Sequence, residues 1–173
     1  MLQQKNLAVR RAVPEDAPLL AAWWNDGRLM AHAGFPNGTG QTAAQVEEEL
    51  RSDAGRRRCR LILEKDQMPV GEMICFATEE KGTVGIGIKI GVEYQNQGMG
   101  KRYLSLVLAA LFAGGCQKVI LDTDIENRRA QHVYEALGFR RRTVCPDAFR
   151  DPSGRLHTAI VYSLIPTDFI AWS

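Results

Sequence analysis

In the stretch YQNQGMGKRYL, residues 94–104, two glycines and two cations lie between an apolar run and a pattern typical of a helix. Glycine at positions 98 and 100 allows a turn whose backbone N–H groups are not covered by a Cβ. A helix that begins there places its positive dipole end at the same point, which favours an anion. Lys101 and Arg102 add positive charge. The stretch therefore predicts a phosphate site at the start of a helix.

The segments around this turn alternate between strand and helix patterns. A first strand is followed by two helices, over 14–30 and 42–54, and then by three strands whose short connections are typical of antiparallel neighbours. After the turn come a helix, an apolar strand, another helix and a closing hairpin. This order predicts an α+β domain with α/β-type layering, in which helices lie on both sides of a mixed sheet. The predicted strands are 7–13, 58–65, 70–78, 83–92, 118–124 and two within 141–165.

Composition excludes several classes of protein. The 173 residues fit one domain spanning 1–173, and 45% hydrophobic with 24% charged residues is typical of a soluble globular protein. A net charge of +2 is too small for a general nucleic-acid binder. No apolar run approaches the ~20 residues of a membrane span, and the first residues carry no apolar signal segment. The four cysteines are scattered without a CxxC pair, which predicts reduced thiols in a cytoplasmic protein without a metal site.

Three interpretations of the glycine turn are open at this point. A nucleotide P-loop is disfavoured, since Gln95 stands where its first glycine belongs and Arg102 replaces its Ser or Thr. A dinucleotide-binding turn lacks its third glycine, because Tyr103 stands there, although Asp122 ends the next strand where a ribose-binding acid would lie. A plain structural turn is the third possibility.

The helix downstream helps to choose between them. In NRRAQHVYEALGF, residues 127–139, an inward-facing stripe is formed by Ala130, Val133, Tyr134 and Leu137, which are spaced at i, i+3, i+4 and i+7. Taken alone, Tyr134 is most simply a core aromatic residue whose hydroxyl finds a partner.

Together, the turn and this helix resemble the GNAT superfamily of acyl-CoA N-acetyltransferases. The resemblance rests on Gln95-x-x-Gly98-x-Gly100 and on Asn127-x-x-Ala130-x-x-x-Tyr134-Glu135-x-x-Gly138-Phe139, which lie at the family's separation. It covers residues 84–139. The stretch WWNDGRLMAHAGFP and the GEM strand are similar to the branch that contains ribosomal-protein alanine acetyltransferases.

The resemblance implies a fold and a cofactor. The fold is a mixed, mostly antiparallel sheet of about six or seven strands, splayed between the strand before the turn and the next strand. The cofactor is acetyl-CoA, whose pantetheine arm lies in the splay while backbone amides hold its pyrophosphate. The residues implied in cofactor binding are Ile88, Ile90, Val92, Gln97, Gly98, Met99, Gly100, Lys101, Arg102, Asn127, Arg129, Ala130 and Tyr134.

The resemblance also implies direct acyl transfer to an amine, with Tyr134 protonating the departing thiolate and a backbone N–H of the splayed strand stabilising the oxyanion. No enzyme nucleophile is needed. Relatives often carry a glutamate base on the strand before the turn, but Gly85 occupies that position here. Glu72 on the neighbouring strand is the predicted alternative, and Glu93 is a second one.

The missing glutamate bears on the acceptor. Freeing a neutral amine at pH 7 costs about 1.4 kcal/mol for an α-amine of pKa about 8, and about 4.6 kcal/mol for a lysine. A protein N-terminal α-amine is therefore the predicted acceptor. A small amine such as an aminoglycoside or polyamine, or a catalytically silent CoA-binding module, are the alternatives, and a homodimer is possible. The predicted acceptor contacts are Trp24, Asn25, His32 and Phe35, each of which also has a simple structural interpretation as a core anchor, turn or cap.

Overall fold

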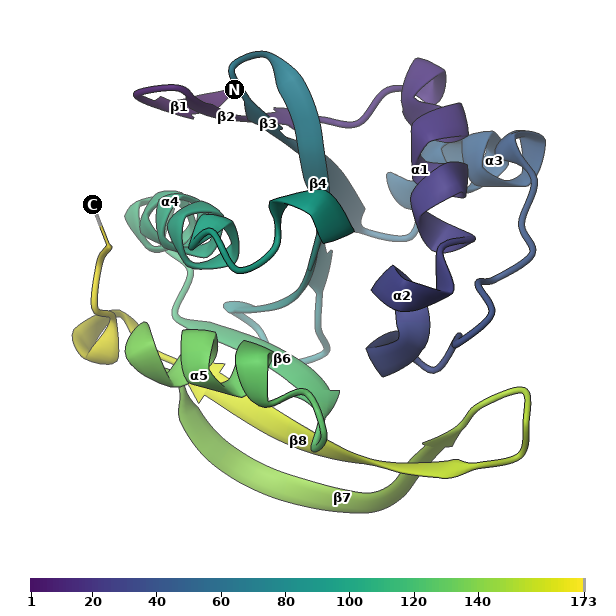
Figure 1. Ribbon diagram of the computed structural model, residues 1–173. Coiled ribbons are helices and arrows are strands. Elements are labelled where there is room, and N and C mark those ends of the chain that lie inside the picture. Colours follow the sequence, from purple (N-terminus) through teal and green to yellow (C-terminus); the bar gives the residue numbers. More distant parts are fainter. Residues whose placement is uncertain (173) are drawn as a thin grey trace.

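The strands form one eight-stranded sheet in the order β1-β2-β3-β4-β5-β6-β8-β7 in the computed structural model, which describes residues 1–172 (Figure 1). Neighbouring strands are antiparallel except β5 and β6, which are parallel. The expected mixed, mostly antiparallel sheet is confirmed. The strands are β1 Leu2–Gln4, β2 Leu7–Arg11, β3 Arg58–Lys65, β4 Met68–Ala77, β5 Thr83–Ile90, β6 Lys118–Asp124, β7 Arg140–Arg150 and β8 Leu156–Leu164.

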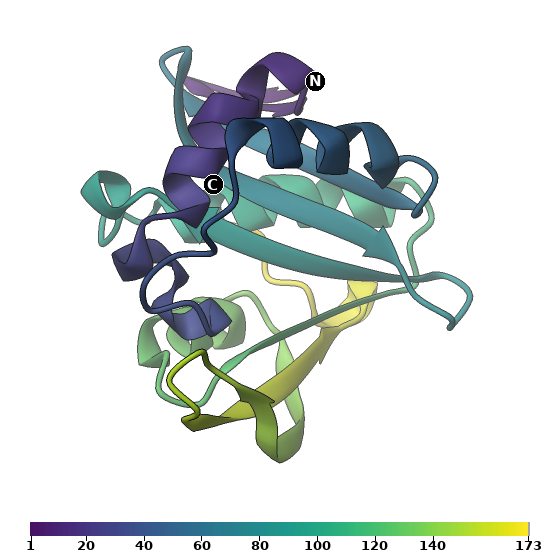
Figure 2. The same ribbon diagram turned by 90° about the vertical axis from the view of Figure 1, so that its right-hand side faces the viewer.

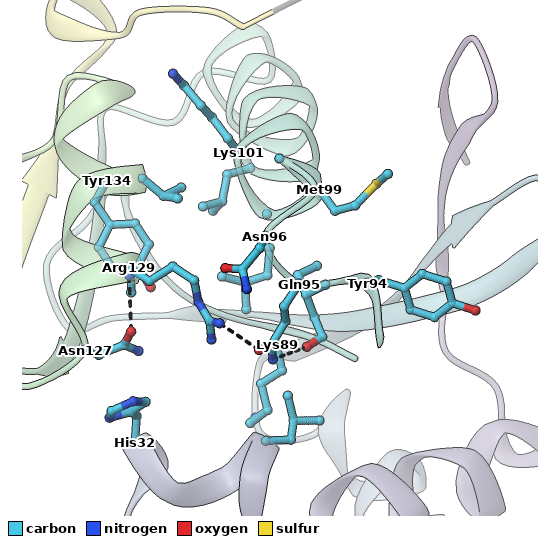
Figure 3. A pocket seen from close by; sticks show the side chains of 18 of the residues that line it. His32, Lys89, Tyr94, Gln95, Asn96, Met99, Lys101, Asn127, Arg129 and Tyr134 are labelled. Carbon is cyan, nitrogen blue, oxygen red and sulfur yellow. Dashed lines mark hydrogen bonds between the residues drawn. The ribbon is translucent and has the colours of Figure 1, made fainter. Parts of the chain in front are cut away.

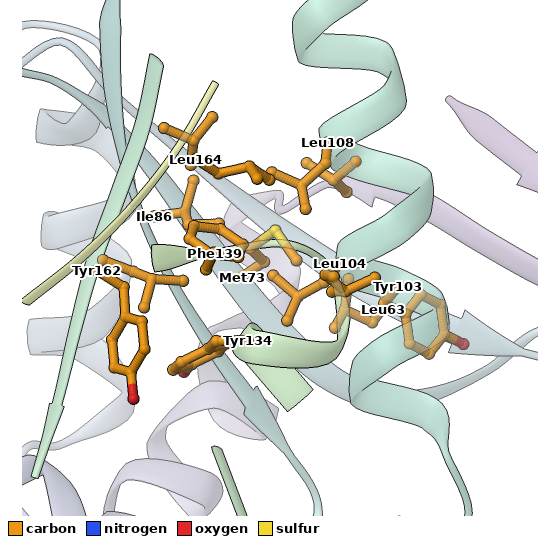
Figure 4. Packing of buried hydrophobic residues seen from close by; sticks show 14 of the residues in the cluster. Leu63, Met73, Ile86, Tyr103, Leu104, Leu108, Tyr134, Phe139, Tyr162 and Leu164 are labelled. Carbon is orange, nitrogen blue, oxygen red and sulfur yellow. The ribbon is translucent and has the colours of Figure 1, made fainter. Parts of the chain in front are cut away.

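Helices cover both faces of the sheet, and Figure 2 looks onto α1 and α3 in front of it. The larger core lies between the sheet and the pair α4 and α5 (Figure 4). A smaller core joins α1, α2 and α3 to Ile62 of β3. The α-helices are α1 Ala17–Trp24, α2 Gly27–Met30, α3 Ala43–Asp53, α4 Met99–Ala113 and α5 Arg128–Ala136, and the 3-10 turns are η1 Pro14–Asp16, η2 Ala31–Ala33, η3 Val92–Tyr94 and η4 Pro166–Asp168.

Three expectations about the elements were wrong. The sheet has an eighth strand, β1, whose three residues are too few to show an alternating pattern. The helix expected over 14–30 is interrupted, because Asp26 accepts a hydrogen bond from the Arg28 N–H at 2.9 Å and starts α2 afresh. The strand expected over 83–92 ends at Ile90, and Val92 begins a 3-10 turn.

The parallel pair β5 and β6 splays apart after three residues. Pairing is limited to Thr83–Gly85 of β5 against Lys118–Ile120 of β6. A Cβ placed on Gly71 of β4 would lie 2.4 Å from the Lys89 carbonyl oxygen, so that carbonyl faces β4. Because backbone groups alternate along a strand, those of Ile88 and Ile90 face the open side. The expected splay is confirmed, and it exposes a strand edge inside the molecule.

Among residues 1–172, no helix is both long enough and apolar enough to cross a membrane.

Candidate active site

A pocket of about 260 Å³ opens where β5 leaves β6 (Figure 3). Its walls come from α2 and η2, from the open half of β5, from the loop into α4, from the first turn of α4 and from α5. Elements that are distant in the sequence therefore meet here because of the splay.

The start of α4 presents free backbone N–H groups to the pocket. Gly98 is the N-cap with a φ of 74°, a left-handed conformation that glycine adopts at little cost. A Cβ at Gly98 would meet no heavy atom within 4 Å, and one at Gly100 would meet only Ile90, at 3.8 Å. The N–H groups of the first helical turn have no acceptor within the helix. They form a cradle in which an anion can approach the backbone directly.

Gln95 connects the two sides of the splay. Its Nε2 donates to the Ile90 carbonyl at 2.8 Å, and its Oε1 accepts from Arg129 Nη1 at 2.7 Å (Figure 3). Since Ile90 lies on β5 and Arg129 on α5, this side chain links the elements across the mouth of the pocket. The Ile90 carbonyl, expected to pair with a ligand, already has a partner.

Tyr134 reaches the pocket from α5, whose first turn is capped by the Asn127 side chain at 3.2 Å from the Ala130 N–H. The ring is 7% exposed and packs against Tyr162 and Phe139, with centroids 5.7 and 5.8 Å apart (Figure 4). Burial, and then the nearby Asp122 and Tyr162, raise the pKa of the Tyr134 phenol. The phenol is therefore protonated throughout the neutral range and can act as a proton donor.

Glu72 lies in a buried polar network behind the pocket. Its side chain is 2% exposed, and Oε1 accepts from Trp24 Nε1 at 2.6 Å and from Lys89 Nζ at 3.1 Å. Oε2 lies 3.4 Å from Arg60 Nη1, and Arg60 also contacts Asp53 at 3.3 Å. Glu72 was predicted as the base and Trp24 as an acceptor contact, but neither residue lines the pocket. Both support α1 against the sheet, and the role of Glu72 as base stays a prediction.

Of the other three predicted acceptor residues, one lines the pocket and two do not. His32 lines the pocket from η2. Asn25 instead ties down the loop that follows, because its side chain bonds the Gln41 carbonyl at 2.9 Å and the Gly40 N–H at 2.8 Å. Phe35 is 39% exposed and lies outside the pocket lining.

The structure brings together most of the predicted cofactor residues. Those in the pocket lining are Ile88, Ile90, Gly98, Met99, Gly100, Lys101, Asn127, Arg129, Ala130 and Tyr134, whereas Val92, Gln97 and Arg102 are outside it. Sequence reasoning missed eight lining residues: Arg28, Leu29, Lys89, Tyr94, Gln95, Asn96, Leu104 and Val133. Gln95 carried a usable signal, since it opens the quoted motif, and so did Lys89, a cation within an apolar strand.

A second group of titratable side chains holds the β7–β8 hairpin near this site. His157 Nδ1 lies 2.7 Å from Asp124 Oδ2 at the end of β6, and its Nε2 lies 3.1 Å from Asp151 Oδ2. Phe149 stacks on the imidazole, and its ring lies 3.0 Å from a Cβ placed on Gly34 beside η2. The Asp151 and Asp124 carboxylates raise the pKa of His157, while Ser153 and then His157 lower the pKa of Asp151 to about 2.

We expect this cluster to make stability depend on pH in a defined direction. Because its folded-state pKa is raised, His157 stabilises fully below its unfolded value of about 6.5 and loses that contribution as pH rises through the higher folded value. Asp151, with a lowered pKa, contributes above about 3.9 and loses its contribution as pH falls toward 2. Thermal unfolding between pH 4 and pH 9 should show a gap between the wild type and His157→Gln that narrows above neutrality. A gap that stays constant over this range would contradict the role of the imidazolium.

Comparison with known proteins shows to which protein family the chain belongs. Residues 6–140 match the family described as "Acetyltransferase (GNAT) domain". The match covers most of the chain, so the chain belongs to the GNAT acetyltransferase family and is a GNAT-type acetyltransferase. Members of this family take their acetyl group from acetyl-CoA.

The individual relatives are more distant. N-alpha-acetyltransferase 30 of Schizosaccharomyces pombe is 31% identical over 85 residues, which cover 47% of this chain and 56% of that protein. The Xenopus laevis protein of the same name is 30% identical over 98 residues, which cover 57% of this chain and 30% of that protein. The chain therefore spans about half or less of the length of these relatives.

Among solved structures, the spermidine N-acetyltransferase of Vibrio cholerae in complex with CoA and spermine has a TM-score of 0.85 at 18% identity, covering 94% of this chain and 97% of that one. At that identity the likeness shows a shared fold.

Proposed function

We propose that this chain holds acetyl-CoA in the splay between β5 and β6 and moves the acetyl group to a primary amine, with the α-amine of a peptide N-terminus as the favoured acceptor. One observation carries the proposal: the open N–H groups of α4, the unpaired edge of β5 and the Tyr134 hydroxyl all border the same pocket. Each of the three would meet a different part of acetyl-CoA: the pyrophosphate, the pantetheine arm and the thioester sulfur.

The residues present fit this cofactor. The cradle at Gly98 and Gly100 is open to a pyrophosphate, since a Cβ at either position would project into free space or reach only Ile90. Lys101 and Arg129 add two cations beside it. The edge of β5 at Ile88 and Ile90 offers N–H and C=O groups to an extended amide-containing arm, as one strand does to another. Gln95 would give up or share the Ile90 carbonyl when the arm enters.

In the proposed mechanism, acetyl-CoA supplies the acetyl group as an activated thioester. A backbone N–H of the open β5 edge stabilises charge on the carbonyl oxygen during attack by the amine. The carbon–sulfur bond breaks as Tyr134 donates its phenolic proton to the departing sulfur, and the proton lost by the attacking amine returns to the phenolate through solvent. General acid assistance of this kind contributes about 10²–10⁴-fold. The nearby carboxylate of Glu72 already accepts from Trp24, Lys89 and Arg60, which supports a reaction without a dedicated carboxylate base.

The absence of such a base favours an amine of low pKa. Deprotonation at pH 7 costs about 1.4 kcal/mol for an α-amine and about 4.6 kcal/mol for lysine. The charge of the pocket argues in the same direction. Its described lining includes Arg28, Lys89, Lys101 and Arg129 but neither Asp nor Glu, an unfavourable setting for a polycation. The relatives named N-alpha-acetyltransferase 30 also favour an α-amine. The likeness to the ribosomal-protein alanine branch stays a prediction.

Cofactor binding is tested by thermal unfolding with acetyl-CoA, CoA, NAD and ATP added separately. A ligand at 100 times its Kd adds about 2.7 kcal/mol, a rise of roughly 5–10 °C for a domain of this size. We expect the rise with acetyl-CoA and CoA only. Gly98→Ala should reduce it, whereas Gly115→Ala is a matched control, because Gly115 also has a positive φ and open space around it. A rise with NAD alone would contradict the proposal.

The acceptor is tested with three amines at pH 7: a lysine-free peptide with a free α-amine, an α-acetylated peptide with one lysine, and spermidine. We expect the free α-amine to react at least ~100-fold faster than the lysine, from the difference in deprotonation cost. Faster acetylation of spermidine would replace the peptide with a polyamine as substrate. CoA binding without transfer to any amine would favour a silent CoA-binding module.

A further inference from the structure

The segment that follows β8 is docked along the two helices of the cofactor side. Phe169 packs on Phe112 of α4 with ring centroids 5.6 Å apart. The Ile170 N–H donates to the Leu137 carbonyl at 3.0 Å, and the Trp172 N–H donates to Ser105 Oγ at 2.7 Å. These contacts carry the chain along α4 toward the helix end that borders the pocket.

The docked segment places Trp172 beside Lys101, in the first turn of α4. Lys101 Nζ lies 3.5 Å from the centroid of the Trp172 ring, and Lys101 belongs to the first turn of α4 and to the pocket lining. Figure 3 shows the Lys101 side chain extending away from the other labelled side chains of the pocket. The indole is 46% exposed, so its surface is only partly covered by Lys101 and Ser105. A large aromatic ring therefore lies half in solvent next to the first turns of α4.

The pocket is too small to enclose the whole cofactor, which leaves a part of it for the surface where this ring lies. About 260 Å³ is below the roughly 300–1,000 Å³ typical of sites that enclose a drug-sized ligand. A pantetheine arm and a pyrophosphate at the α4 cradle would use this space, so the nucleoside beyond the pyrophosphate must lie outside it, on the surface next to the first turn of α4. Trp172 and Lys101 are at that surface.

We propose that Trp172 and Lys101 form the seat for the nucleotide end of the cofactor, with the indole stacking on the purine and the ammonium pairing with an adjacent phosphate. This inference rests on the proposed function. Every base has a π-face that stacks on an aromatic side chain, and the Lys101 ammonium, 3.5 Å from the indole centroid, puts a positive charge next to that stack.

The test compares Kd values, measured by calorimetry, for CoA and for 4′-phosphopantetheine, which lacks the adenosine bisphosphate. Trp172→Ala should weaken CoA roughly 5- to 30-fold, in line with the loss of one base–aromatic stack. It should leave the Kd for 4′-phosphopantetheine within about twofold, because that fragment lacks the adenosine that would reach the indole. Trp172→Phe should restore most of the CoA affinity.

Two results overturn the inference while the proposed function stands: an unchanged Kd for CoA in Trp172→Ala, or an equal loss for both ligands, which would mean that the segment only supports α4. Failure of the wild type to bind CoA at all would instead overturn the proposed function. Because 4′-phosphopantetheine reports on the pocket itself, a variant with a loosened segment still gives an interpretable comparison.

Discussion

Replacing Tyr134 with Phe should lower kcat by about 10²–10⁴-fold and leave the Kd for CoA within a few fold, the loss expected when a general acid is removed. The aromatic packing against Tyr162 and Phe139 remains in the variant, so the fold should be kept. Steady-state kinetics with acetyl-CoA and the α-amine peptide, combined with CoA calorimetry, measure both quantities. Because burial raises the pKa of this phenol, Tyr134 should cause no loss of kcat between pH 7 and pH 9.

The matched control is Tyr103→Phe. Tyr103 is also buried and donates its hydroxyl to the Glu64 carbonyl, but it does not line the pocket. We expect this variant to lose about 1 kcal/mol of stability with kcat unchanged. A kcat for Tyr134→Phe within threefold of the wild type would remove Tyr134 as the proton donor.

Replacing Glu72 with Ala should cost about 3–5 kcal/mol of unfolding free energy, because it leaves Arg60 and Lys89 without their buried carboxylate. Trp24 Nε1 loses its acceptor in the same step. Chemical denaturation measures the loss. Glu126→Ala is the control: Glu126 pairs with Arg155 at 2.7 Å, but its side chain is 57% exposed, and such surface pairs contribute about 0–1 kcal/mol.

Glu72→Gln separates a structural role from a catalytic one. The amide keeps the shape of the side chain and one acceptor oxygen, so most molecules should remain folded at low temperature. If Glu72 is structural, kcat of the folded enzyme should be nearly unchanged and its pH profile should keep its form. A loss of more than about 100-fold in kcat, with a change in the acidic limb of the profile, where a carboxylate base becomes protonated, would establish Glu72 as the base.

The cofactor side was largely readable from the sequence because its determinants are local. Gly98 and Gly100 act through their own missing Cβ atoms, and Asn127 caps the helix in which it stands. Tyr134 follows seven residues later on the same face of that helix. The order of strands and helices along the chain also predicted the strands of the sheet. The exception is β1, which is too short to give a pattern.

The acceptor side was poorly readable because its contacts are long-range. Trp24 and Glu72 are 48 positions apart, and only the packing of α1 on the sheet makes them partners rather than pocket residues. Asn25 closes a loop with Gly40 and Gln41 in place of facing a substrate. An aromatic or an amide side chain can serve equally well as a structural residue or as a substrate contact. Which of the two it becomes depends on which surface is buried when the chain folds.

The sequence by itself determined where an open glycine turn starts a helix and where a tyrosine faces inward on the next one, since each needs only a turn or a single helix. The tertiary structure decided which groups share the pocket. The early end of the β5–β6 pairing opened the strand edge, Gln95 joined Ile90 to Arg129 across it, and the segment after β8 brought Trp172 to Lys101. The contact between Ile90 and Gln95 joins residues 5 positions apart, whereas Lys101 and Trp172 are 71 positions apart. Contacts between such distant residues form only when the sheet and its two helix layers have packed.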